Sequence, residues 1–174
     1  MQRRFKNSKI QDLLYSCLMN DKDYLKIALD KARESVRQGG FPAGAVVVKD
    51  EKIISTGVSL GFILHDPTSH AEAAAIREAC KSLKTTSLEG ATLYESLTCC
   101  VMCFSAANWA GITKIVSGCM KTPEMVSKQY YEGKTDVSKL NEENTRRIEL
   151  VYLPDFENDS LALIKKWEKR VGFR

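Results

Sequence analysis

The chain has 174 residues, of which 44% are hydrophobic and 28% charged, and these proportions predict one globular domain with a sizeable core. Its net charge of +4, from 26 basic and 22 acidic residues, is too small to indicate a nucleic-acid-binding protein by itself. No apolar run approaches the roughly 18 residues of a membrane-spanning helix, so we expect no membrane partner.

The predicted elements of the first half are a helix, a hairpin and a loop. From Asp23, apolar residues at helical spacing predict a helix that Gly39 and Gly40 end. The runs 43–50 and 52–58 are rich in β-forming residues and predict two strands joined in a hairpin around Asp50 and Glu51. Residues 60–69 predict a loop, which leads into a helix that begins near His70.

The second half predicts a strand over 91–97, a helix over 100–111 and a strand over 114–119, which together form a right-handed parallel crossover. After a variable segment follow a last strand over 147–153 and a closing helix over 159–169. Five strands with interleaved helices predict an α/β fold with three layers, α/β/α, around a central five-stranded mixed sheet.

Two parts of the chain are expected to differ in role. Residues 1–20 precede this layout and form an N-terminal extension, for which an extra helix and a loose tail are both open. Residues 21–174 form a single domain.

The cysteines indicate the redox setting. They are Cys17, Cys80, Cys99, Cys100, Cys103 and Cys119. The basic first residues are followed by a short apolar segment that carries Asp12, which is not typical of a secretory leader. We therefore expect a cytoplasmic protein, in which clustered cysteines indicate metal binding or catalysis before disulfides.

Three side chains at predicted helix starts have the chemistry of zinc ligands. Cys100 and Cys103 are three residues apart, so both thiols fall on one helix face near the positive end of its dipole, which favours the thiolate. His70 begins its own helix. A tetrahedral zinc with three protein ligands keeps a fourth position for water, whose pKa the metal lowers to about 7. Glu72 is close enough to exchange a proton with that water.

A plainer interpretation exists for each of these residues. His70 alone could cap a helix, and Cys100 and Cys103 alone could be small core residues, since free cysteine is among the most buried residue types. Cys99 is a second candidate ligand, but it lies four residues before Cys103 instead of three. Because the pieces occur together at strand-to-helix junctions, we favour a zinc site of His70, Cys100 and Cys103.

Four stretches carry a resemblance to a known family, and they are FPAGAVVVKD, DPTSHAEAAAIR, TLYESLTCCVMC and KIVSGC. From about Tyr24 to about Lys169 the chain resembles the zinc-dependent cytidine deaminase-like superfamily, whose signature combines HxE with PCxxC. Its purine-type branch is the most similar, with guanine deaminases, bacterial tRNA adenosine deaminases and yeast-type cytosine deaminase.

The resemblance implies a hydrolytic deaminase with one zinc ion per subunit. His70, Cys100 and Cys103 would be the ligands and Glu72 the acid and base. The substrate would be a nucleobase or nucleoside, with a purine such as guanine favoured. The resemblance also implies a homodimer or larger homo-oligomer.

The same resemblance nominates residues that bind the substrate. They are Phe41, Gly44, Ser59, Ala71, Thr98 and Cys99, to which Trp109 is added as a residue that either stacks on a ring or belongs to the core. Two departures bear on specificity: Ser59 stands where relatives usually have asparagine, and Thr98 and Cys99 stand where relatives commonly have glutamate and proline. A hydroxyl has fewer hydrogen-bonding groups than an amide, and losing the proline frees a backbone torsion in the turn before Cys100.

The remaining aromatic and histidine residues have weaker indications. Phe104 is as much a core candidate as a stacking one. His65 could contact the substrate or a neighbouring subunit, but the sequence favours a solvated loop position for it. Phe156, Trp167 and Phe173 near the C-terminus are candidates to cap a bound base.

Other functions stay open from the sequence. A tRNA-specific adenosine deaminase would need RNA as its partner, and basic residues at both ends of the chain are interspersed with acidic ones. A cytosine or cytidine deaminase is a further alternative. A non-enzymatic zinc-stabilised binding module competes from another class, but it would not need Glu72.

Overall fold

The computed structural model describes residues 19–172, so the expectations for residues 1–18 and for Phe173 lie outside the described part. The helices are α2 (Asp21–Arg37), α3 (Gly61–Leu64), α4 (Ala71–Leu83), α5 (Val101–Ala110), α6 (Pro123–Ser127), α7 (Val137–Glu143) and α8 (Glu157–Val171). The strands are β1 (Phe41–Lys49), β2 (Lys52–Ser59), β3 (Thr92–Glu95), β4 (Lys114–Ser117) and β5 (Glu149–Tyr152), and a 3₁₀ turn spans Pro154–Phe156.

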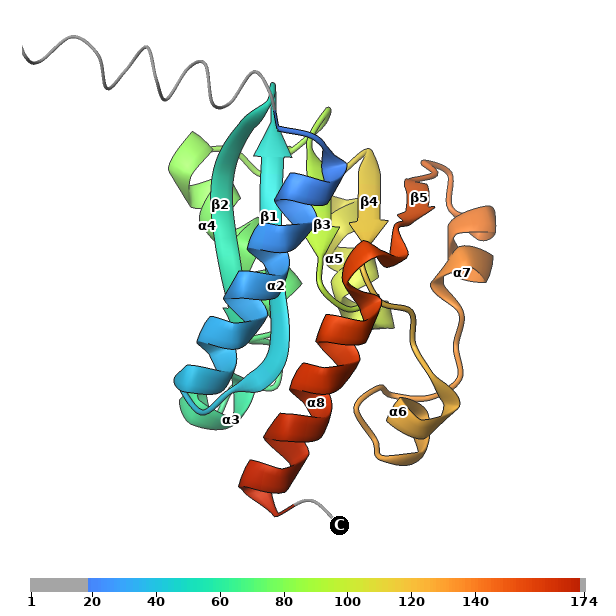
Figure 1. Cartoon of the computed structure of the whole chain (residues 1–174). Coiled ribbons are helices and arrows are strands. Elements are labelled where there is room, and N and C mark those ends of the chain that lie inside the picture. The colour runs from blue at the N-terminus through green and yellow to red at the C-terminus, as the bar shows by residue number, and fades with distance from the viewer. Residues whose placement is uncertain (1–18, 173–174) are drawn as a thin grey trace, which may run out of the picture.

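The strands form one mixed sheet in the order β2-β1-β3-β4-β5. β1 is antiparallel to both β2 and β3, whereas β3, β4 and β5 run parallel. Helices α2 and α8 lie in front of the sheet in Figure 1, and α4 and α5 lie behind it. The predicted α/β fold with a five-stranded mixed sheet between helical layers is confirmed.

The interior strand β1, which lies between β2 and β3, is buried on both faces. Ala45 and Val47 pack in the larger core with α4 and α5, whereas Val46 and Val48 pack in a second core against Leu25 and the rest of α2. This alternation follows from the two-residue period of a strand, and burial on both faces is why β1 reads as a continuous apolar run.

Local signals explain most element boundaries. Asn20 caps α2 through hydrogen bonds from Lys22 N and Asp23 N, which places the helix start close to the predicted one. In the hairpin, Asp50 and Glu51 have φ values of 50° and 60°, as a two-residue turn with both central residues left-handed requires.

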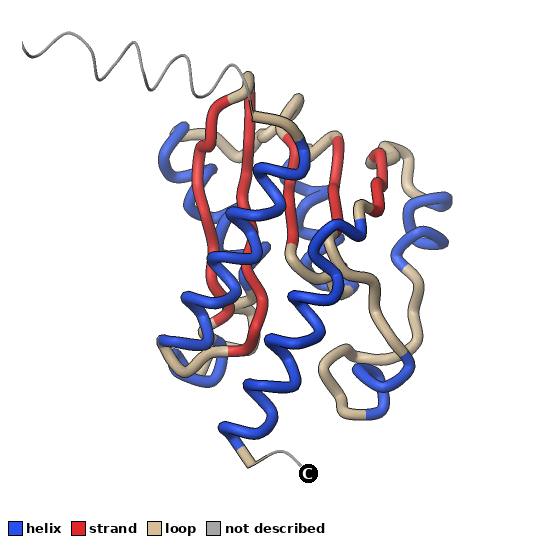
Figure 2. The backbone as a smooth tube through the Cα atoms, viewed as in Figure 1, coloured by secondary structure: helices blue, strands red, loops and turns tan. Residues whose placement is uncertain are grey.

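Three short helices lie where the sequence predicted a loop or no defined element. α3 lies inside the predicted loop 60–69, and α6 and α7 lie in the variable segment (Figure 2). They contain 4, 5 and 7 residues respectively, which is too short for a hydrophobic period to emerge over two or more turns.

Two glycines let helices approach the sheet closely. A Cβ on Gly44 would lie 2.2 Å from Ala28 O in α2, and a Cβ on Gly57 would lie 1.9 Å from Ala71 O in α4. Glycine is needed where backbones approach this closely. Gly57 therefore fixes how near the first turn of α4 lies to β2.

None of the helices in residues 19–172 is long and apolar enough to cross a membrane.

Candidate metal centre and active site

The two helices that begin behind the sheet carry the candidate metal ligands. His70 is the N-cap residue of α4 and Cys100 is the N-cap residue of α5, both with extended backbone conformations. Neither side chain caps its own helix, so both are directed elsewhere. Cys103 lies in the first turn of α5 and Glu72 in the first turn of α4. Because β2 and β3 both run antiparallel to β1, they end at the same edge of the sheet, and α4 and α5 begin beyond that edge.

The ligand atoms form a compact group. His70 Nδ1 lies 3.5 Å from Cys100 Sγ, and the ligand atoms of His70, Cys100 and Cys103 all lie within 4.8 Å of one another. A tetrahedral zinc with usual bond lengths separates a nitrogen and a sulfur ligand by about 3.6 Å, so the imidazole and the Cys100 thiol already stand at ligand spacing. One imidazole and two thiols are a donor set typical of zinc, and the group fits that ion.

The protonation of this group favours a thiolate. A hydrogen bond from Cys103, together with His70, lowers the pKa of Cys100 to about 4 against the cost of burial. The hydrogen bond to Cys100 and burial raise the pKa of Cys103, and the hydrogen bond with Cys100 raises the pKa of His70 although burial opposes it. The lowered pKa of Cys100 favours its charged sulfur, which is the form that a metal ligand requires.

Glu72 stands beside this group and is almost buried. Its side chain is 5% exposed, and its Oε2 lies 3.6 Å from Cys103 Sγ. Burial raises the pKa of Glu72, and the nearby Cys100 charge adds to the effect. A buried carboxyl group with a raised pKa is suited to a role as a general acid and base.

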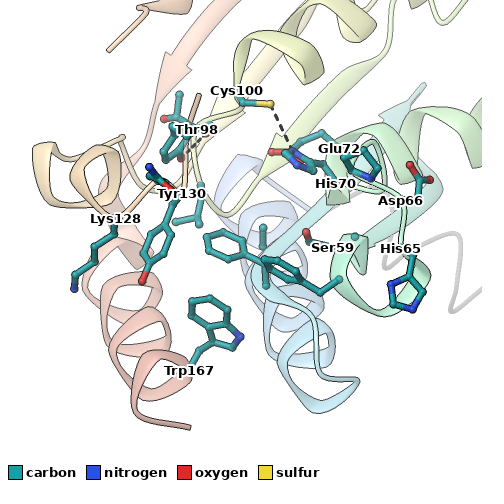
Figure 3. A pocket seen from close by; sticks show the side chains of 18 residues that line it. Ser59, His65, Asp66, His70, Glu72, Thr98, Cys100, Lys128, Tyr130 and Trp167 are labelled. Carbon is teal, nitrogen blue, oxygen red and sulfur yellow. Dashed lines mark hydrogen bonds between the residues drawn. The ribbon is translucent and has the colours of Figure 1, made fainter. Parts of the chain in front are cut away.

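The candidate centre opens into a cavity of about 670 Å³, which lies within the range of small-molecule binding sites. His70, Glu72 and Cys100 lie at one end of it and Trp167 at another (Figure 3). Its lining comprises Phe41, Ala43, Ser59, Gly61, Phe62, His65, Asp66, Pro67, His70, Glu72, Leu97, Thr98, Cys100, Lys128, Gln129, Tyr130, Tyr131 and Trp167.

The structure brings some of the nominated substrate residues to this cavity and leaves others away from it. Phe41, Ser59 and Thr98 line it, as does Trp167 among the C-terminal candidates. The others are not part of the lining, and they are Gly44, Ala71, Cys99, Phe104, Trp109 and Phe156.

Most residues outside the lining pack elsewhere, and Phe156 packs against the second core beside α2. Gly44 lies under α2, Ala71 and Cys99 are buried at 0% and 2% exposure, and Phe104 is a core residue. Trp109 is 87% exposed, so this cavity offers no support for its stacking role.

Sequence reasoning missed the cavity wall formed by residues 128–131, which Glu132 follows. Tyr131 Oη donates a hydrogen bond of 2.7 Å to Thr98 O, and Val101 N donates one of 2.8 Å to Glu132 Oε1. The segment is thereby tied to the turn before Cys100 and to the start of α5. The adjacent tyrosines Tyr130 and Tyr131 were its only sequence signal, and they lie in a segment without periodicity.

Three rings meet on the wall opposite the candidate metal ligands. The Phe41 centroid lies 5.2 Å from that of Trp167 and 5.3 Å from that of Tyr130, and all pairs stand edge to face. Aromatic pairs in this arrangement contribute more stability than the burial of their apolar surface alone. We call Phe41, Tyr130 and Trp167 the aromatic cluster.

The fold brings an imidazole and two thiols together at two helix starts as a candidate metal site, and a comparison with known families identifies the class of protein. Residues 18–119 match the family described as the cytidine and deoxycytidylate deaminase zinc-binding region. The chain belongs to this family.

Two curated relatives that match the chain differ in their named activity. The chain is 42% identical over 98 residues to a tRNA-specific adenosine deaminase from Aquifex aeolicus (strain VF5), covering 56% of this chain and 65% of the relative. It is 46% identical over 93 residues to a guanine deaminase from Bacillus subtilis (strain 168), covering 53% and 60%. The matched region therefore spans less than two thirds of these curated relatives.

A solved structure extends the likeness over more of the chain. The X-ray structure of guanine deaminase from Bacillus subtilis superposes with a TM-score of 0.61 at 34% identity, covering 87% of this chain and 95% of that one.

Proposed function

We propose that this protein is a zinc-dependent hydrolytic deaminase that releases ammonia from a nucleobase or nucleoside, with a purine such as guanine as the favoured substrate. The observation that carries the proposal is the buried Glu72 carboxyl group, 3.6 Å from Cys103 Sγ, at the end of a cavity large enough for a ring. A binding module that used zinc only for stability would not need a carboxyl group there.

The candidate residues have separate roles in the proposed reaction. His70, Cys100 and Cys103 would hold zinc, which when bound supplies a Lewis acid that activates water at neutral pH. Glu72 takes a proton from the attacking water and delivers it to the departing amino group. The C–N bond breaks, a carbonyl replaces the amino group, and one water is consumed for each ammonia released.

The cavity walls favour a flat, uncharged substrate. The aromatic cluster supplies apolar surface that can pack against a ring, and Ser59 offers a hydroxyl group toward its polar edge. Lys128 also lines the cavity, but its ammonium group lies 2.6 Å from Glu124 and 2.9 Å from Glu168. Because two carboxylates already neutralise Lys128, it does not favour a phosphorylated substrate.

A second candidate function is deamination of adenosine in tRNA. The 42% identity to the Aquifex aeolicus tRNA-specific adenosine deaminase favours it, and it would require a single-stranded base extruded into the cavity.

One panel tests both candidates. Ammonia release is measured with the zinc-loaded full-length protein against guanine, adenine, cytosine, their nucleosides and an anticodon stem-loop RNA. Release from guanine or another purine supports the proposal, release from the RNA alone replaces it with the second candidate, and release from cytosine or cytidine alone contradicts the purine assignment. If no compound of the panel releases ammonia, both candidate functions are contradicted.

Glu72→Gln is the matched control, because it keeps the shape of the side chain and removes its acid. We expect turnover to fall by about 10²- to 10⁴-fold while the zinc content, measured by elemental analysis, stays at one ion per chain. Unchanged turnover would refute the role of Glu72.

The expected homo-oligomer is also a proposal. Trp109 and Met102 on α5 are 87% and 36% exposed, and burying them in a subunit interface would remove apolar surface from water. Light scattering of the full-length protein should give a mass of two or more chains, and a monomer mass would contradict it.

A further inference from the structure

Glu95 is a carboxyl residue enclosed in the sheet. It ends β3, is 1% exposed, and pairs in register with Ala45 of β1 and Ser117 of β4. Because side chains alternate along a strand, Glu95 points to the same face as Leu93, which packs in the core shared with α4 and α5. Its carboxyl group therefore lies on the side of the sheet where the candidate ligands gather.

The two oxygens of this carboxyl group have different environments. Oε1 accepts a hydrogen bond of 2.9 Å from Cys99 N and one of 2.7 Å from Ser117 Oγ. Oε2 is buried and has no hydrogen-bond partner among the described residues. A buried carboxyl group is unfavourable unless its partners compensate, so packing alone does not account for Glu95 at this position.

Cys99, whose N–H donates to Glu95, lies in the turn that positions the candidate ligand Cys100. Earlier in this turn, Thr98 N donates to Cys119 O at 2.8 Å and Tyr131 Oη donates to Thr98 O. Cys99 comes next, directly before Cys100, and its N–H donates to Glu95. This N–H is buried with the rest of Cys99, which is 2% exposed. The bond to Glu95 is thus the last restraint on the turn before the thiol of Cys100.

We propose that Glu95 is a positioning residue for the metal centre: through the N–H of Cys99, its carboxyl group holds the turn that places the Cys100 thiol beside His70 and Cys103. The proposal rests on the ligand role of Cys100 given under the proposed function. Groups that orient a metal ligand in this way commonly change metal affinity by about 10- to 100-fold when they are removed.

The test is zinc affinity of the full-length protein, measured by competition with a chromophoric chelator. Glu95→Val, which removes the acceptor and suits a strand, should lower the affinity about 10- to 100-fold. Glu95→Gln keeps an acceptor and should restore an affinity close to that of the wild type. Ser117→Ala is the matched control, since it removes the other donor to the same oxygen but lies outside the turn; it should leave zinc affinity unchanged.

Two further measurements separate positioning from general destabilisation. In the cobalt-substituted protein, the visible absorption bands that report ligand geometry should shift in Glu95→Val and not in Ser117→Ala. In a Cys99→Pro background the turn has no N–H to restrain, so Glu95→Val should cost little further zinc affinity there.

The proposal is overturned if Glu95→Val keeps the wild-type zinc affinity, or if it loses no more affinity than Ser117→Ala. It is also overturned if Glu95→Val costs as much zinc affinity in the Cys99→Pro background as it does in the wild-type chain. Cys100→Ser tests the underlying site separately: if that variant binds zinc as tightly as the wild type, the ligand assignment fails. Loss of zinc in Cys100→Ser without any loss in Glu95→Val refutes the positioning role alone.

Discussion

Substitution of Gly57 by alanine should disturb the packing of β2 against α4 and thereby displace residues of the candidate metal centre. The added Cβ would lie 1.9 Å from Ala71 O and 2.7 Å from Ala75 N. Both atoms belong to the backbone of α4, so no side-chain rotation can relieve the overlap. The first turn of α4 would have to move from β2 by about 1.5 Å to restore an ordinary contact.

Two magnitudes follow from that displacement. Overpacking of this kind costs about 1–3 kcal/mol of unfolding free energy, which exceeds the gain of about 0.5–1 kcal/mol that alanine brings to a strand in place of glycine. The moving turn carries His70 and Glu72, and a displacement near 1 Å at a reacting group can cost about 10²-fold in rate. We therefore expect Gly57→Ala to lower stability, zinc affinity and turnover together.

The assays are urea denaturation, chelator competition for zinc and ammonia release. Gly118→Ala is the control, because its Cβ would meet nothing closer than Leu25 Cδ2 at 3.5 Å, and it should change all three little. The reasoning is refuted if Gly57→Ala unfolds within about 0.5 kcal/mol of the wild type and binds zinc equally well.

Three other outcomes follow from the structure. Trp167→Ala should cost about 3–5 kcal/mol of stability and raise KM, whereas Trp167→Phe should recover much of both, as denaturation and kinetics would show; equal losses would argue against an aromatic wall. Burial, with the charge of Glu72, raises the pKa of Glu95 from 4.5 to about 8, so the unfolded chain releases this proton first and stability should fall between about pH 5 and 8. That fall should be about 1–3 kcal/mol larger in the wild type than in Glu95→Gln, and parallel pH profiles would contradict it. Zinc at a hundredfold excess over Kd should add about 3 kcal/mol to the unfolding free energy and so raise the melting temperature. Cys103→Ser should abolish this rise; a rise equal to the wild type's would remove Cys103 from the site.

The fold was predictable where local patterns and global packing agree. The helix from Asp23, the hairpin around Asp50 and the crossover between residues 91 and 119 each carry a period or a turn signal of sufficient length. The short helices α3, α6 and α7 carry none, since a helix of two turns or fewer is determined mainly by tertiary contacts.

The candidate site likewise has a part that could be predicted from the sequence and a part that could not. Spacing nominated His70, Cys100 and Cys103 because metal chemistry imposes a pattern on the chain itself. The cavity wall has no such pattern: Trp109 and Trp167 both lie in predicted helices, yet one is 87% and the other 4% exposed. Which face of a helix meets the cavity depends on how the helix packs, and that information is spread over the whole chain.

The use of two helix starts for metal ligands also limits how this protein can be stabilised. Neither His70 nor Cys100 makes a side-chain capping hydrogen bond, although a serine or aspartate at such a position commonly adds about 1 kcal/mol. An engineer scanning for uncapped helices would select these two positions first, and at both of them the stabilising substitution would delete a candidate zinc ligand. Greater thermal stability therefore has to come from other positions, such as the ends of α3 and α8, whose N-cap residues Leu60 and Phe156 likewise form no side-chain cap.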